Sequence, residues 1–141
     1  MIDLVLNPPV LVFGGPYSNL RALAALRQRA DELGIPASHC ICTGDVVAYC
    51  AEPEETTAAI RDWGCHVIAG NCEEQLAAAA HDCACGFEEG SECDRLAKGW
   101  YPFANARMSA AEPRLDGRFA EGADLRGRRL AICASSTAAS M

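Results

Sequence analysis

Polar groups that could bind a ligand follow three short apolar runs of the sequence. They are Gly44-Asp45 after residues 41–43, Gly70-Asn71 after residues 65–69, and the loop at 14–19 after residues 10–13. Asp45 supplies a carboxylate at one junction, and backbone N–H groups around Gly14 and Gly15 could cradle a phosphate. In open α/β sheets, ligands bind just beyond the carboxyl ends of the strands. We therefore expect the three loops to converge on one site.

Each of these features also has a purely structural interpretation. Asp45 could be a turn or N-cap residue, and Gly70-Asn71 could be ordinary turn chemistry. A lone pair such as Gly14-Gly15 is weak evidence for a phosphate site, since a tight turn needs the same residues. Glu73 and Glu74 are expected at the start of a helix simply because the helix dipole favours acids there. The combination of three junctions favours the site interpretation most strongly for Asp45.

The hydrophobic pattern predicts an α/β fold. We predict strands at 10–13, 39–43 and 65–69, and helices that begin near residues 20, 52 and 72. Ser18 or Asn19 caps the first helix and Gly34 ends it, while Gly64 ends the second. The order β-α-β-α-β-α implies a parallel sheet with right-handed crossovers.

Outside this pattern the assignments rest on shorter signals. Residues 1–9 are expected to form a loose lead-in. Residues 88–100 are expected to form a helix with Leu96 and Ala97 facing the core. Residues 115–119 and 128–133 could be strands.

The composition indicates one folded domain without a membrane span. Half of the 141 residues are hydrophobic, enough for a domain with a core. A net charge of −7 argues against nucleic-acid binding, which needs a basic surface. No apolar run reaches the roughly 20 residues of a membrane helix. Asn7-Pro8-Pro9 interrupts the apolar N-terminus, so no secretory signal is predicted and we expect a cytoplasmic protein.

Three motifs together resemble those of the calcineurin-like metallophosphoesterases, in their small bacterial and archaeal phosphodiesterase branch. Gly44-Asp45-Val46-Val47-Ala48-Tyr49 followed by Glu52-Pro53 resembles the family's Gly-Asp motif, and Gly70-Asn71-Cys72-Glu73 resembles its Gly-Asn-His-Asp/Glu motif. Residues 13–20 resemble the family's first strand and loop. The resemblance covers roughly residues 10–100 of a single domain spanning 1–141, with residues 101–141 as a divergent or truncated second half.

The resemblance implies a β-sandwich flanked by helices, of which the first βαβαβα half is complete, and a site for two divalent metal ions (Mn, Fe or Zn). In the family these metals bridge a hydroxide that attacks a small phosphate mono- or diester in line. Asp45 would be the bridging ligand and Asn71 a ligand of the second metal. Cys72 would stand where the family has a catalytic His near the phosphate. Positions beside the phosphate would be Gly15, Tyr17, Asn19, Gly44 and Gly70.

The chain departs from the family pattern at most of the metal ligands. Gly15 and Tyr17 occupy the positions of an Asp and a His, and the three histidines all precede the region that supplies histidines in the family. Asp45 and Asn71 alone would not hold a two-metal centre, since catalytic zinc sites usually have three protein ligands. Either the chain is a shortened representative, or its branch has rebuilt the site with cysteines. A partial sandwich would expose sheet edges, so we expect homo-oligomerisation or instability.

Nine cysteines support a second hypothesis. Without an export signal they are expected to be mostly reduced thiols or metal ligands rather than a disulfide framework. Cys83, Cys85 and Cys93, with Cys72, form the densest group and could hold Zn or an Fe–S cluster in a noncatalytic or redox-linked metal-binding protein. The alternative is that they are buried reduced thiols. For Cys72, the start of a helix would lower the thiol pKa.

Overall fold

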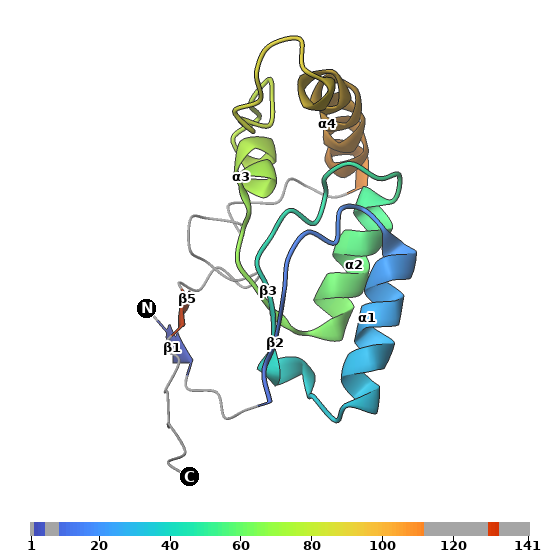
Figure 1. The fold of residues 1–141 in the computed structure, drawn as a ribbon, viewed down its shortest axis with the longest axis vertical. Helices are drawn as coiled ribbons and strands as arrows, with labels where there is room; N and C mark the ends of the chain where they lie inside the picture. The colour runs from blue at the N-terminus through green and yellow to red at the C-terminus, as the bar shows by residue number, and fades with distance from the viewer. Residues whose placement is uncertain (1, 5–8, 112–129, 133–141) are drawn as a thin grey trace.

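The computed structural model describes residues 2–4, 9–111 and 130–132. At its centre is a parallel sheet of three short strands. The strands are β2 (Leu11–Phe13), β3 (Cys40–Cys42) and β4 (His66–Val67), in the order β2-β3-β4 (Figure 1). Val12 lies opposite Ile41, and Ile41 lies opposite His66. Each connection passes through a helix, which is the geometry that parallel neighbours require. The predicted parallel α/β core is confirmed.

A second pairing joins the two ends of the sequence. Strand β1 (Ile2–Leu4) pairs in parallel with β5 (Leu130–Ile132), with Asp3 opposite Ala131. The predicted strand at 128–133 is confirmed in its centre, and the expected loose lead-in is wrong for residues 2–4. The predicted strand at 115–119 lies outside the described residues.

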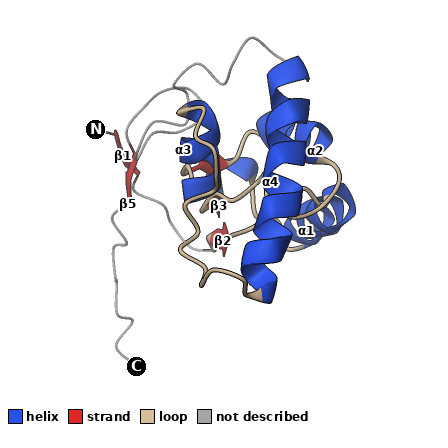
Figure 2. Cartoon of the chain, turned by 90° about the horizontal axis from the view of Figure 1, so that it is seen from above, coloured by secondary structure: helices blue, strands red, loops and turns tan. Residues whose placement is uncertain are grey.

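Two helices cover the same face of the three-stranded sheet (Figures 1 and 2). Helix α1 spans Leu20–Glu32, and helix α2 spans Pro53–Trp63. Asn19 Oδ1 accepts the N–H of Ala22 at 3.0 Å, which caps α1 as predicted. Gly64 ends α2 in the left-handed conformation that glycine adopts without strain. A short 3-10 turn, Ala37–His39, leads into β3.

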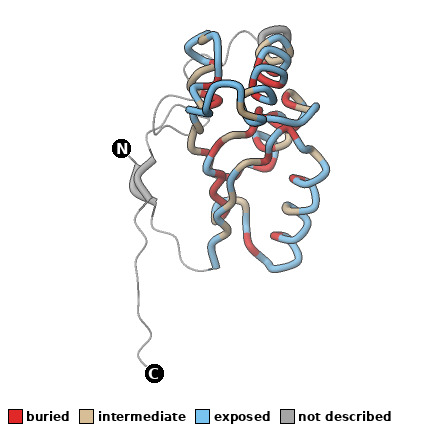
Figure 3. The backbone as a smooth tube through the Cα atoms, turned by 45° about the horizontal axis from the view of Figure 1, so that its top comes forward, coloured by how far each residue is buried: buried red, intermediate tan, exposed pale blue. Residues whose placement is uncertain are grey.

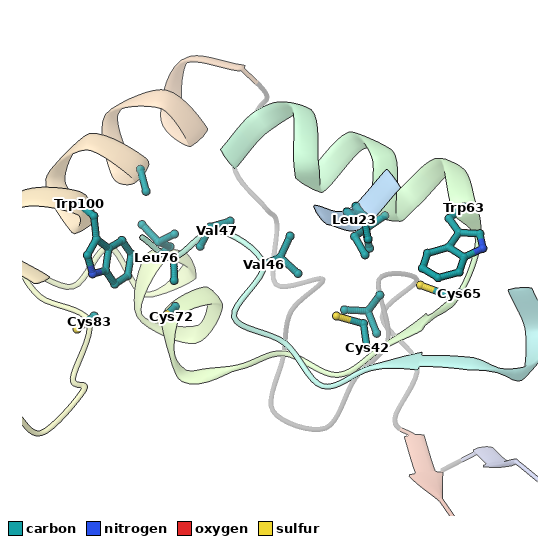
Figure 4. Packing of buried hydrophobic residues seen from close by; sticks show 14 of the residues in the cluster. Leu23, Cys42, Val46, Val47, Trp63, Cys65, Cys72, Leu76, Cys83 and Trp100 are labelled. Carbon is teal, nitrogen blue, oxygen red and sulfur yellow. The ribbon is translucent and has the colours of Figure 1, made fainter. Parts of the chain in front are cut away.

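The hydrophobic core lies between these helices and the sheet and continues past the carboxyl ends of the strands (Figures 3 and 4). Leu23 and Trp63 pack over Cys42 and Cys65, and the Trp63 ring stacks on Phe13 with centroids 5.4 Å apart. Cys40 and Cys42 are fully buried, as expected for core residues on one face of a strand. At the other end of the core lie Val46, Val47, Cys72, Leu76, Cys83 and Trp100.

Two further helices lie beyond the carboxyl ends of the strands. Helix α3 spans Asn71–Ala77, shorter than predicted, and α4 spans Glu92–Ala111 (Figure 1). Within the described residues, no helix is long and apolar enough to cross a membrane. Arg107 of α4 bonds to Glu54 at the start of α2, with Nε 2.8 Å from Oε2, which ties the two helices together.

Helix α4 starts later and runs further than the sequence predicts. Ser91 Oγ accepts the N–H of Asp94 at 3.1 Å, so Ser91 is the cap and the helix begins after it. Its buried stripe is Ala97, Trp100, Tyr101 and Ala104, at the spacing of one helical face. Leu96 lies one position out of phase and is 58% exposed, so its predicted inward orientation is wrong, while that of Ala97 is confirmed.

Substituting Asn19 with Ala should lower the free energy of unfolding by about 1 kcal/mol, because the N–H of Ala22 loses its acceptor. Asn19→Ser keeps a capping oxygen and should change stability by only a few tenths of a kcal/mol. Urea unfolding of both variants, followed by circular dichroism, measures the difference. Equal stability of the two variants would contradict the capping role.

Candidate functional site

The loops after β2 and β3 are joined by their backbones. Gly15 donates its N–H to the carbonyl of Gly44 at 3.1 Å, and Tyr17 donates to Asp45 at 3.2 Å. Ser18 continues the series by donating to the carbonyl of Val46 at 2.6 Å. Three backbone hydrogen bonds therefore hold the two loops together. The expected convergence of the loops after β2 and β3 is observed.

The loop after β4 joins this unit through one carboxylate, that of Glu73. Its Oε2 accepts the N–H groups of Asp45 at 2.8 Å and Gly70 at 2.9 Å, and its Oε1 accepts that of Val47 at 3.2 Å. Glu73 is fully buried. A single side chain on α3 thus holds the second and third loops together, which completes the three-loop junction formed by residues 14–19, 44–50 and 70–73.

The pKa of Glu73 is raised above its ordinary value. Removal from water is the larger effect, and the three N–H groups, which favour the carboxylate, offset only part of it. From the sequence, Glu73 is expected only to occupy a favourable position at the start of a helix. The signal that could have found it is the Gly-x-x-Glu spacing, since a Glu at the third helical position commonly accepts the N–H of the N-cap residue, here Gly70.

Gly44 and Gly70 are explained by close packing of two backbones. A Cβ on Gly44 would lie 2.6 Å from the Cα of Gly70 and 2.8 Å from the carbonyl oxygen of Ile68. A Cβ on Gly70 would lie 2.6 Å from the backbone nitrogen of Asp45. Gly44 also has a φ of 98°, which side chains rarely permit. Both glycines, predicted as phosphate neighbours, have a structural reason to be where they are.

Asp45 occupies the centre of the junction. Its backbone is left-handed, with a φ of 56°, a conformation that Asp tolerates better than most residues. Its Oδ1 is buried and has no donor in hydrogen-bond geometry among the described residues, while the Cys72 thiol is near enough to hydrogen-bond to the carboxyl group. The side chain lies against Gly70 and close to the Cys72 thiol. A buried carboxylate oxygen without a partner is costly, so this atom would gain from binding a ligand. Ser18 Oγ is the other buried side-chain oxygen of the junction with no partner in the part of the chain that the structure describes.

Asn71, the second predicted metal ligand, is turned toward the segment that follows α3. Its Nδ2 donates to the carbonyl of Cys83 at 3.0 Å and lies 3.6 Å from Cys85 Sγ and 3.8 Å from Cys72 Sγ. The amide nitrogen is therefore engaged, and the amide oxygen is the atom that a cation would use. The structure brings Asp45, Asn71 and Cys72 together at the start of α3.

Cys72 is a neutral thiol in this setting. Burial raises its pKa, and the negative charges of Asp45 and Glu73 raise it further. The expectation that the start of the helix lowers this pKa is wrong, because desolvation and two nearby carboxylates outweigh the helix dipole. A protonated thiol can donate a hydrogen bond but is a poor nucleophile.

The side chain of Tyr17 covers the first loop, at a position predicted to lie beside a phosphate. Its ring lies over the backbone of Gly15 and packs edge-on against Tyr49, with centroids 5.0 Å apart. Tyr49 continues the row to Trp100 at 5.2 Å. The N–H groups of Gly15, Tyr17 and Ser18 are all bonded to the second loop. These three groups of the proposed phosphate cradle are thus already satisfied within the fold.

A cleft of about 280 Å³ lies beside this loop, against α1. It is lined mainly by apolar atoms from residues that include Gly15, Tyr17, Asn19, Leu23 and Cys50. Asn19 directs its side-chain oxygen to the helix N-terminus, where the cap bond engages it. The cleft could accommodate a small molecule, but its lining, drawn from the described residues, includes no charged side chain that would bind a phosphate ester.

The donor set does not fit a two-metal centre. Within the described ranges, no three His, Cys, Asp or Glu side chains are arranged to hold a metal ion. Glu73 is close by, but both of its oxygens are occupied by backbone N–H groups. Asp45 and Asn71 remain as two oxygen donors, fewer than a catalytic metal usually needs.

The cysteines divide into two kinds. Free thiols in the described part of the chain are Cys40, Cys42, Cys50, Cys65, Cys72 and Cys93. Burial raises the pKa of Cys42 to about 11 and that of Cys65 to about 12. Cys83 and Cys85 form a disulfide, so the expectation of reduced thiols is wrong for this pair. Cys93 is exposed on α4, and the disulfide engages two of the four proposed metal-binding sulfurs.

No protein-family model, no curated protein and no solved structure matches the chain. The likeness to metallophosphoesterases therefore rests on the three sequence motifs alone.

Replacing Glu73 with Gln should lower the free energy of unfolding by about 1–3 kcal/mol, because the new NH₂ group faces an N–H donor that loses its acceptor. Glu74→Gln, one residue along the same helix, is the matched control and should change stability by less than about 0.5 kcal/mol. Chemical denaturation of both variants measures the difference. Equal effects of the two substitutions would show that Glu73 does not hold the junction.

Cys72 should react with iodoacetamide much more slowly than the exposed Cys50, and its rate should still be rising at pH 9 because its pKa is raised. Asp45→Asn removes one of the charges responsible, so the Cys72 rate should increase about threefold to tenfold. Buried Cys65, whose pKa does not depend on Asp45, is the internal control. Peptide mass mapping follows each site, and equal rates for Cys72 and Cys50 would refute the assignment.

Proposed function

We propose that the chain is a degenerate relative of the metallophosphoesterases, in which the three-loop junction is retained and hydrolysis of phosphate esters is weak or lost. The observation that carries the proposal is the placement of Asp45. Its carboxylate stands at the carboxyl end of the middle strand of a parallel sheet, next to Asn71 and Cys72, and one of its oxygens is buried with no partner in the described part of the chain. In open α/β sheets, ligands bind just beyond the carboxyl ends of the strands.

The same residues argue for loss of turnover. Two oxygen donors do not make a binuclear centre, and the positions expected to complete it are the backbone of Gly15 and the packed ring of Tyr17. Cys72, in the place of the family's His, is held as a neutral thiol and is a weak proton donor near pH 7. Among the residues that the structure describes, the groups around Asp45 can therefore contact a ligand, but they do not supply the positive charge that stabilises a phosphoryl transition state.

A second candidate is a noncatalytic or redox-linked metal-binding protein. The observation in its favour is that Asn71 Nδ2 lies within 4 Å of the sulfurs of both Cys72 and Cys85, so three sulfurs would gather there once the Cys83–Cys85 bond is reduced. Thiolates of this kind select zinc or iron–sulfur clusters. Metal analysis of anaerobically purified protein distinguishes the two candidates. Zinc or iron lost in Cys83→Ser, and retained in Asp45→Ala, would support this one.

Hydrolysis of an aryl phosphate with added Mn²⁺ tests the first proposal. We expect a kcat below roughly 1 s⁻¹, which is the lower end of the range of typical enzymes. Wild type and Asp45→Ala should have the same kcat. Asp31→Ala, which removes an exposed acid of α1, controls for nonspecific loss of charge. Fast turnover that Asp45→Ala abolishes and Asp31→Ala preserves would contradict the loss of catalysis.

A further inference from the structure

The segment between α3 and α4 carries the disulfide of Cys83 and Cys85 beside a cleft of about 370 Å³. Lys98 and Tyr101 of α4 form the facing wall of this cleft. Cys83 is buried, at 4% exposure, whereas Cys85 is half-buried. The two sulfurs of the bond therefore differ in their access to a molecule that enters the cleft.

This disulfide is expected to contribute little to the stability of the fold. The stabilisation from a cross-link grows with the length of the loop that it closes, and this bond spans only two residues of sequence separation. Other bonds already hold the segment, because Asn71 Nδ2 binds the carbonyl of Cys83 and Asp82 Oδ1 accepts the N–H of Ala84 at 2.9 Å. Neither of these contacts involves the two bonded sulfurs.

A third sulfur, that of Cys72, lies near the disulfide but is buried. Asn71 Nδ2 is 3.8 Å from Cys72 Sγ and 3.6 Å from Cys85 Sγ, which makes Cys72 a neighbour of the disulfide. Cys72 is itself buried, at 3% exposure, and so is Cys83. Cys85 is the most accessible sulfur of the three, so a thiol from solvent reaches the disulfide through the cleft that Cys85 lines.

We propose that Cys83 and Cys85 form a reversible dithiol–disulfide site that exchanges with small thiols entering through this cleft, with Cys85 as the sulfur attacked. A first thiolate bonds to Cys85 Sγ, and the bond between the two protein sulfurs breaks to release Cys83 as a thiolate. A second thiolate attacks the added sulfur of the mixed disulfide and releases Cys85. Two thiols become one small disulfide, and their two protons and two electrons pass to the protein pair.

The test uses the full chain with the exposed Cys50 and Cys93 replaced by Ser, so that they do not compete. Reduced or oxidised glutathione is added without denaturant, the reaction is quenched by alkylation, and peptides are mapped by mass. We expect Cys83 and Cys85 to become alkylated together in reduced glutathione and to close again in oxidised glutathione. No variant of the pair is needed for this measurement, so it does not depend on how such variants fold.

Single replacements then assign the attacked sulfur. In Cys83→Ser, the remaining Cys85 should form a mixed disulfide with oxidised glutathione at least about tenfold faster than Cys83 does in Cys85→Ser, because Cys83 is buried. Circular dichroism verifies that both variants fold.

Two results would overturn the proposal. One is a disulfide that resists an excess of reduced glutathione until urea is added, which would make it structural. The other is a pair of thiols that stays open in oxidised glutathione, which would mean that no disulfide forms there. Equal trapping in the two single variants would overturn the assignment of Cys85.

Discussion

The arrangement of the three loops depends on one buried carboxylate that accepts three backbone N–H groups. Glu73 reaches from α3 to Asp45 and Val47 in the loop after β3, and back to Gly70 in its own loop. Without it, three donors would lie in the core with no acceptor, and each such loss costs about 1–3 kcal/mol. Burying the carboxylate is itself unfavourable, which is why its pKa is raised although its bonds are good. The contact is thus an obligatory one rather than a source of large net stability.

Most backbone N–H groups discussed for the three-loop junction donate to acceptors within the junction itself. Backbone groups that could have received a phosphate at the first loop donate to the second loop instead, and the ring of Tyr17 covers Gly15. Asp45 Oδ1 and Ser18 Oγ are the exceptions, since neither has a hydrogen-bond partner among the described residues. The junction thus combines a well-satisfied backbone with two buried side-chain oxygens that have no partner within the described ranges.

Local signals in the sequence were sufficient for the elements of residues 10–77, but not for contacts made over long separations. The cap at Asn19 and the stop at Gly64 involve neighbours in sequence, and they are found as predicted. The pairing of β1 with β5 joins the two ends of the chain, and no local pattern encodes such a partner. Glu73 combines both cases, because its bond to Gly70 is local whereas its bond to Asp45 crosses 28 residues. For Cys83 and Cys85, the spacing alone does not distinguish thiols, metal ligands and a disulfide, so the bonded state emerged only from the structure.

The claim at the centre of this account is that Glu73 holds the three loops as one cooperative unit. Amide hydrogen exchange of the native protein, followed by NMR, measures this most directly. The N–H groups of Asp45, Val47 and Gly70 should be protected and should share one opening free energy, because a single carboxylate accepts all three. Fast exchange of these groups, or three unrelated opening free energies, would contradict the account.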